Sequence, residues 1–163
     1  MTELAIGFLN GFGLPPVEFV DLAADLGCRY ISAVVQGAPL VPLGYAPFSL
    51  KDDPALRSDV LAATRRRGVA ASLGDGFLVL LDTETGSFGA DLDVLAALGV
   101  PRINVVSLDP DLGRTFDRFA ALTELAAERG MQTVVEPVPG LTVGDLPTAL
   151  AARDTCAGLT FDC

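Results

Sequence analysis

The chain has 163 residues, half of them hydrophobic and a fifth charged, and its formal net charge is -10. This length predicts one domain spanning 1–163, and the composition excludes a disordered chain, because such chains are poor in apolar residues and rich in charge. The sequence contains no histidine, which excludes Ser-His-Asp and Cys-His catalysis and histidine-ligated zinc within these residues. The acidic balance argues against a nucleic-acid partner. The one basic run, Arg65-Arg66-Arg67, is predicted to end a helix and complement its dipole.

The sequence shows no recognisable targeting or membrane segment. The first four residues, Met-Thr-Glu-Leu, form no basic leader before an apolar stretch, so we expect no signal peptide. The longest apolar stretch, 31–48, is broken by a glutamine and three prolines, whereas a membrane span needs about 20 apolar residues. Cys28, Cys156 and Cys163 are odd in number and lack CxxC spacing. Reduced thiols in a cytoplasmic protein, with no membrane partner, are the expectation.

Six short apolar runs alternate with amphipathic stretches along the chain. The predicted strands are 4–9, 30–35, 69–73, 102–107, 132–136 and 158–162. Helical spacing of apolar residues predicts helices between them, most clearly over 17–26 and 116–129. Four helices are predicted to end on glycines in the left-handed conformation, namely Gly27, Gly68, Gly99 and Gly130. Nearly continuous apolar runs are typical of parallel strands buried on both faces, so the fold class is α/β.

Two parallel architectures compete. A doubly wound sheet of five or six strands would be complete at this length, whereas a (β/α)8 barrel needs eight strands and about 250 residues. Length alone therefore favours the doubly wound sheet. The segment 11–16 begins like the dinucleotide-binding pattern G-x-G-x-x-G, but Pro16 occupies the position of the third glycine. A small nucleotide-binding module stays open as an alternative.

A polar group follows every predicted strand. These groups are, in chain order, Asn10, Gln36, Ser72 with Asp75, Ser107 with Asp109, Glu136 and Asp162. Since ligands of parallel α/β folds bind at the carboxyl ends of the strands, these residues are candidates for a site. Loops often begin with a polar residue in any protein, so ordinary loop starts also explain much of this pattern.

Glu136 and Asp162 are the strongest candidates, because each directly ends a buried apolar run. A carboxylate at such a place is costly to desolvate unless it is paired or bound to a cation. Neighbouring strands lie about 5 Å apart, so the two carboxylates would repel each other and a divalent cation would relieve that repulsion. Ligands that offer only oxygen favour Mg²⁺ or Mn²⁺. The alternative for each acid is a solvated loop residue or a helix N-cap.

Several segments, taken in order, resemble the xylose isomerase-like TIM barrels, the group of sugar phosphate isomerases and epimerases. The segments are FVDLAADLGC at 19–28 followed by Ile31-Ser32, then Asp91-Leu92-Asp93 with Ala97-Leu98-Gly99 and Ile103-Asn104-Val105, then AAERG at 126–130 with Val135-Glu136-Pro137, and GLTFD at 158–162. The resemblance covers essentially the whole chain. It implies an incomplete (β/α)8 TIM barrel with about six βα units.

The resemblance also implies a chemistry, namely metal-dependent proton transfer on a sugar or polyol. Glu136 corresponds to the family's metal ligand and acid–base residue, and Asp162 to a second metal ligand. The family's later His, its ligands from strands seven and eight and its second acid–base Glu are not among these residues, and Gln36 stands near the place of another His. We therefore expect this chain alone to hold Mg²⁺ or Mn²⁺ weakly and to be inactive. The alternative is a non-catalytic subunit whose open strand edges bind a second copy or a complementing chain.

Overall fold

The computed structural model describes residues 3–11, 13–37 and 44–161. Six parallel strands form one sheet in the order β1-β2-β3-β4-β5-β6. The strands are β1 Ala5–Ile6, β2 Tyr30–Val34, β3 Ala70–Val79, β4 Arg102–Ser107, β5 Gln132–Val135 and β6 Leu159–Phe161. The strands follow one another in the sheet without a reversal, which confirms barrel order and contradicts the doubly wound alternative.

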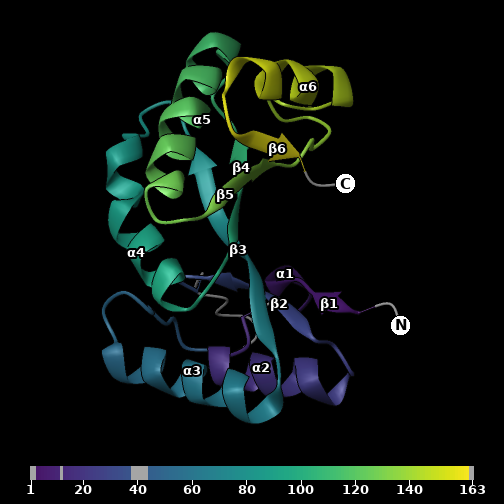
Figure 1. The fold of residues 1–163 in the computed structure, drawn as a ribbon, viewed down its shortest axis with the longest axis vertical. Coiled ribbons are helices and arrows are strands. Elements are labelled where there is room, and N and C mark those ends of the chain that lie inside the picture. Colours follow the sequence, from purple (N-terminus) through teal and green to yellow (C-terminus); the bar gives the residue numbers. More distant parts are fainter. Residues whose placement is uncertain (1–2, 12, 38–43, 162–163) are drawn as a thin grey trace.

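Helices connect the strands, and the larger ones lie on the outer side of the curved sheet (Figure 1). They are α1 Phe8–Gly11, α2 Pro16–Asp25, α3 Pro54–Arg67, the 3-10 helix η2 Thr85–Phe88 that leads into α4 Gly89–Ala97, α5 Leu112–Ala127 and α6 Leu146–Thr155. Among the described residues, β1 and β6 each pair on one side only, so the sheet is not closed. An incomplete barrel of six βα units is therefore the observed architecture.

The structure corrects two of the predicted strands. The run predicted over 4–9 is a strand only at Ala5–Ile6, since α1 begins at Phe8 and the Phe8 N–H donates to Ser32 Oγ at 2.8 Å. The run predicted over 69–73 continues to Val79, because Gly76 adopts a φ of +102° and allows a bulge where the sequence predicts an end. Ser72 and Asp75 therefore lie within β3 and do not follow it.

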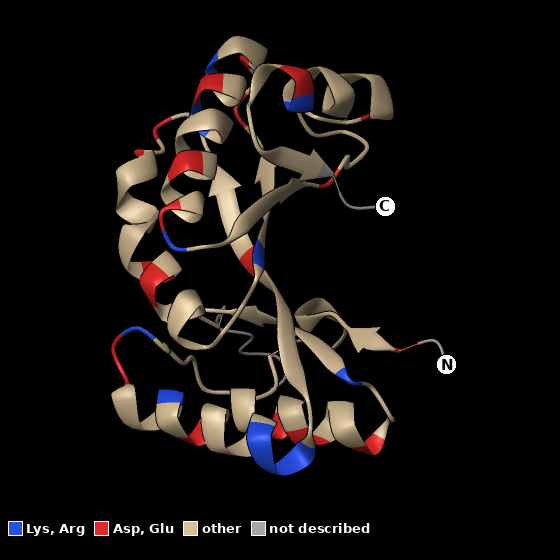
Figure 2. Ribbon diagram, viewed as in Figure 1, with Lys and Arg blue, Asp and Glu red and all other residues tan. Residues whose placement is uncertain are grey.

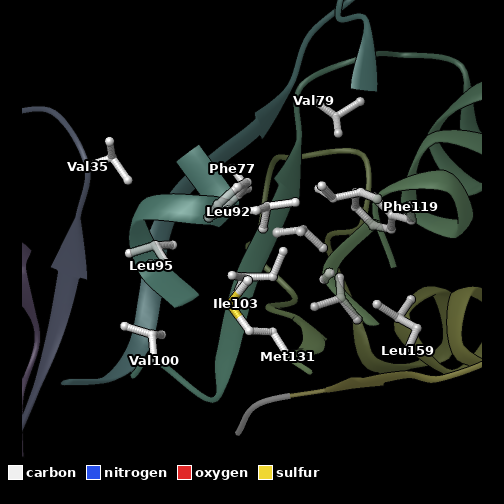
Figure 3. Close-up of a cluster of buried hydrophobic side chains, with 14 of the residues drawn as sticks. Val35, Phe77, Val79, Leu92, Leu95, Val100, Ile103, Phe119, Met131 and Leu159 are labelled. Carbon is white, nitrogen blue, oxygen red and sulfur yellow. The ribbon is translucent and has the colours of Figure 1, made fainter. Parts of the chain in front are cut away.

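The two faces of β4, in the middle of the sheet, differ in burial. In β4 the residues Ile103, Val105 and Ser107 are buried against the helices, whereas Asn104 and Val106 between them are only partly buried. The expectation of strands buried on both faces is wrong for β4 on this second side, which we call the inner face and which none of the larger described helices covers (Figure 1). It is confirmed for β5, where residues 133–135 are all buried. Figure 3 shows the outer core, where side chains of β3 and β4 meet those of α4 and α5.

The predicted helix ends are confirmed. All four predicted glycines have positive φ: +77° at Gly27, +68° at Gly68, +76° at Gly99 and +73° at Gly130. The basic run occupies the last turn of α3, where Arg66 and Arg67 pair with Asp21 of α2 (Figure 2).

Two other expectations concern the membrane and the thiols. None of the helices in the described part of the chain is long and apolar enough to cross a membrane. Within the same residues Cys28 and Cys156 are free thiols, whereas Cys163 lies outside them.

Candidate functional site

Glu136 directly follows β5, at the carboxyl edge of the sheet. Its side chain is exposed, and its Oε2 accepts a hydrogen bond of 2.9 Å from Nδ2 of Asn104 in β4. Asn104 is paired in register with Val134, and Glu136 lies two residues beyond Val134. Because strand side chains alternate between faces, this contact lies on the inner face. The structure therefore presents Glu136 where the sequence predicts a site.

Asp162, the other predicted metal ligand, lies outside the described residues. The last described pair of the β5–β6 ladder is Val135 with Phe161, and Glu136 and Asp162 are the residues that follow this pair in the sequence. Residues 3–11, 13–37 and 44–161 contain no group of three or more His, Cys, Asp or Glu that could hold a metal ion. Near Glu136, Asn104 Oδ1 is a buried oxygen without a hydrogen-bond partner in this part of the chain. The donor types fit a hard cation, while the described ligands are too few to enclose one.

Asp109, which the sequence places after β4, is the centre of a buried ion cluster. Its carboxylate has no exposed area and lies 2.5 Å from Arg114 Nε and 2.7 Å from Arg118 Nη1. The hydrogen bond from Arg114, together with the Asp111 backbone N–H, lowers the pKa of Asp109 to about 2 against the opposing effect of burial. Arg118 also donates to carbonyl oxygens after β3, so the cluster joins two loops. We assign it a structural role.

Two neighbours of Asp109 are also structural. Asp111 caps α5 by accepting the N–H of Arg114 at 2.8 Å. Ser107 is buried and its hydroxyl lies 2.8 Å from Thr115 Oγ1. These contacts hold the start of α5 against the end of β4.

A polar cavity of about 220 Å³ lies at the carboxyl end of β2, and Gln36, Asp75 and Asp91 are among its lining residues. Beside it the only lysine of the chain, Lys51, makes an ion pair of 2.7 Å with Asp91, and this hydrogen bond raises the pKa of Lys51. Gln36 is exposed and forms an isolated bridge with the loop that precedes α3. Asn10, by contrast, is an exposed residue of α1 and does not end a strand.

Sequence reasoning missed two features of this edge. The Lys51–Asp91 pair joins residues 40 positions apart, and no sequence pattern predicts it. Asn104 could have been recognised as a candidate from the sequence, because it is the one polar residue within the apolar run 103–106. Its partner, 32 residues away, becomes visible only once the strand register is known.

No protein-family model and no curated protein matches the sequence. Many solved structures are similar, and three of them that match over nearly the whole chain illustrate the fold. They are a D-psicose 3-epimerase crystallised in the presence of D-fructose (TM-score 0.73, 10% identity, 98% of this chain and 62% of that chain), 3-keto-D-glucoside 4-epimerase from E. coli (0.73, 15%, 99% and 67%) and a xylose isomerase-like TIM barrel protein from Mycobacterium smegmatis in complex with magnesium (0.68, 14%, 99% and 66%). At such identities the likeness shows the fold.

The chain spans 62% of the length of the psicose epimerase. The strand order and these similarities agree with the resemblance seen in the sequence. The chain has the fold of the xylose isomerase-like TIM barrels over six of their βα units.

Proposed function

We propose that this chain is part of a metal-dependent isomerase or epimerase that acts on a sugar or polyol, with residues 1–163 forming one partial barrel domain. The observation that carries the proposal is the place of Glu136, at the carboxyl end of β5 on the inner face and hydrogen-bonded to Asn104. In support, two of the similar structures are sugar epimerases and the third is a magnesium complex.

In this proposal Glu136 and Asp162 hold the divalent cation, Mg²⁺ or Mn²⁺, through their carboxylates. The bound cation would polarise a carbonyl or hydroxyl oxygen of the substrate. Glu136 takes a proton from the carbon next to that oxygen. Return of the proton to the neighbouring carbon completes an isomerisation, whereas an epimerisation needs a second acid on the opposite face of the substrate, which residues 1–163 do not identify. Asn104 uses one lone pair of Oε2, so the second lone pair of Oε2 can bind the cation while Oε1 accepts the proton. A positioned acid–base group contributes roughly 10²–10⁴-fold to the rate.

Activity assays on ketoses, aldoses and inosose-like polyols test the proposal. The chain of 163 residues alone should show no turnover above background, because it offers one identified acid–base group. Strands seven and eight, supplied on a continuous chain or in trans, should create activity that Glu136→Gln removes. Glu18→Gln, a change of an exposed helical residue, is the matched control. A completed and folded barrel whose turnover is the same with Glu136→Gln would contradict the proposal.

The second candidate is a non-catalytic subunit that assembles with another chain or a second copy. Two observations favour it. Leu78 and Leu108 expose 45% and 49% of their surface. Among the described residues, β1 and β6 each pair on one side only, so both have an unpaired edge. Native mass spectrometry and light scattering decide this candidate. A stable dimer or a co-purifying chain supports it, and a monodisperse monomer contradicts it.

A further inference from the structure

An asparagine at position 104 lowers the stability of β4 compared with an apolar residue. Its neighbours in the strand, Ile103 and Val105, are fully buried apolar residues, and asparagine is disfavoured in strands. Its Oδ1 is buried and has no hydrogen-bond partner in the described part of the chain, which costs free energy. A valine would avoid both costs. The stability of the sheet therefore does not explain an amide here.

The contact with Glu136 does explain it. Nδ2 of Asn104 donates to Oε2 of Glu136 at 2.9 Å. If the amide were turned around, Oδ1 would face the carboxylate at that distance, and two acceptors would repel each other. The carboxylate thus fixes the orientation of the amide, and the amide in turn restrains the carboxylate.

The neighbouring strand β3 has a bulge opposite Asn104. The register pairs Gly74 with Ile103 and Phe77 with Val105, so Asp75 and Gly76 together lie opposite Asn104. Such bulges occur often beside functional sites, where they redirect a side chain. Two independent features, a bulge in β3 and a partly unsatisfied amide in β4, therefore meet at Asn104, the residue that contacts Glu136.

We propose that Asn104 is the positioning residue for Glu136: its amide holds Oε2 and leaves Oε1 turned to the ligand. This inference rests on the proposed function, in which Glu136 binds the cation and moves the proton. Hydrogen-bond partners that orient metal-binding groups typically contribute 10–100-fold to metal affinity or activity. Asn104 acts through Glu136 and need not touch the substrate.

Asparagine-selective ¹⁵N labelling tests the contact directly, because Asn10 and Asn104 are the only asparagines of the chain. In the metal-free protein, Glu136→Gln should shift the side-chain amide signals of Asn104 and leave those of exposed Asn10 in place. Glu18→Gln should change neither pair. Asn104 signals that do not respond to Glu136→Gln overturn the inference, whatever the fate of the proposed function.

Titration with Mn²⁺, followed by water proton relaxation, gives the second readout. Asn104→Ala should weaken Mn²⁺ binding roughly 10–100-fold, and Asn10→Ala should not. Equal Mn²⁺ affinity for the Asn104→Ala variant and the unaltered chain overturns the inference. An unaltered chain that binds no Mn²⁺ at all contradicts the proposed metal site, and the amide signals then decide the inference alone.

Discussion

The packing of β3 against α4 leads to a sharp prediction at Gly74. A Cβ atom added to Gly74 would lie 2.4 Å from Leu95 Cδ1 and 3.3 Å from Ile103 Cγ2. Both neighbours are fully buried, so neither side chain can move out into solvent. Gly74→Ala therefore forces Leu95 out of its rotamer or moves α4 away from the sheet, at the strand position next to the bulge.

The magnitude follows from two opposing effects. Adding a methyl group to a packed core typically costs about 1–3 kcal/mol. Replacing glycine also stiffens the unfolded chain, which returns about 0.4–1 kcal/mol where the backbone allows alanine. We expect a net loss of about 1–2 kcal/mol in the free energy of unfolding. The matched control is Gly86→Ala, where a Cβ would meet nothing within 4 Å, and its effect should stay within about 0.5 kcal/mol.

Urea denaturation of both variants, with the slope m compared as well as the midpoint, measures this difference. Leu95→Ala creates the space that the new methyl group needs. In that background Gly74→Ala should cost less, with a coupling energy of about 0.5 kcal/mol or more. If Gly74→Ala is as stable as Gly86→Ala, the close packing of β3 on α4 is refuted.

Three further predictions concern single residues. The pKa of Asp109 is about 2 in the folded protein and 3.8 as a free group, so its contribution to stability is fully present above pH 3.8 and is lost as the pH falls toward 2. Urea unfolding midpoints should therefore fall less steeply across this pH range for Asp109→Asn than for the unaltered chain. Parallel curves for the two proteins would contradict the assignment. Asp53→Ala removes the N-cap bond to Leu56 and should cost about 0.5–2 kcal/mol in thermal unfolding, whereas exposed Asp59→Ala should cost much less. Calorimetry with Mn²⁺ should show weak binding, and a submicromolar site abolished by Glu136→Gln would overturn this expectation.

The sequence predicts the middle of the sheet better than its first strand. Arg102–Ser107 matches the predicted strand because Ile103, Val105 and Val106 form an apolar run broken only by Asn104, and a glycine and a proline precede it. The length of β3 was missed because Gly74 and Gly76 look like a turn, whereas one is required by a close helix and the other by a bulge. Both requirements come from tertiary contacts, which periodicity does not contain.

The candidate site was predictable to a similar degree. The sequence selects Glu136 because a carboxylate after a buried strand is costly without a partner, and the structure places it directly after β5; its role stays a prediction. Asp109 was a candidate as a polar residue after the fourth predicted strand, but two arginines from the following helix pair with it, which the strand pattern does not reveal. Asn104 was visible as a polar residue in an apolar run, yet its role depends on register.

Deuterium incorporation measures most directly whether Glu136 moves a proton. A barrel completed with strands seven and eight, loaded with Mn²⁺ and incubated with a ketose in heavy water, is followed by proton NMR at the carbon next to the carbonyl group. We predict that the signal of that carbon-bound proton disappears with the unaltered residue and persists with Glu136→Gln, provided both proteins are folded. Equal rates of deuterium incorporation in the two proteins would contradict the proposed role of Glu136.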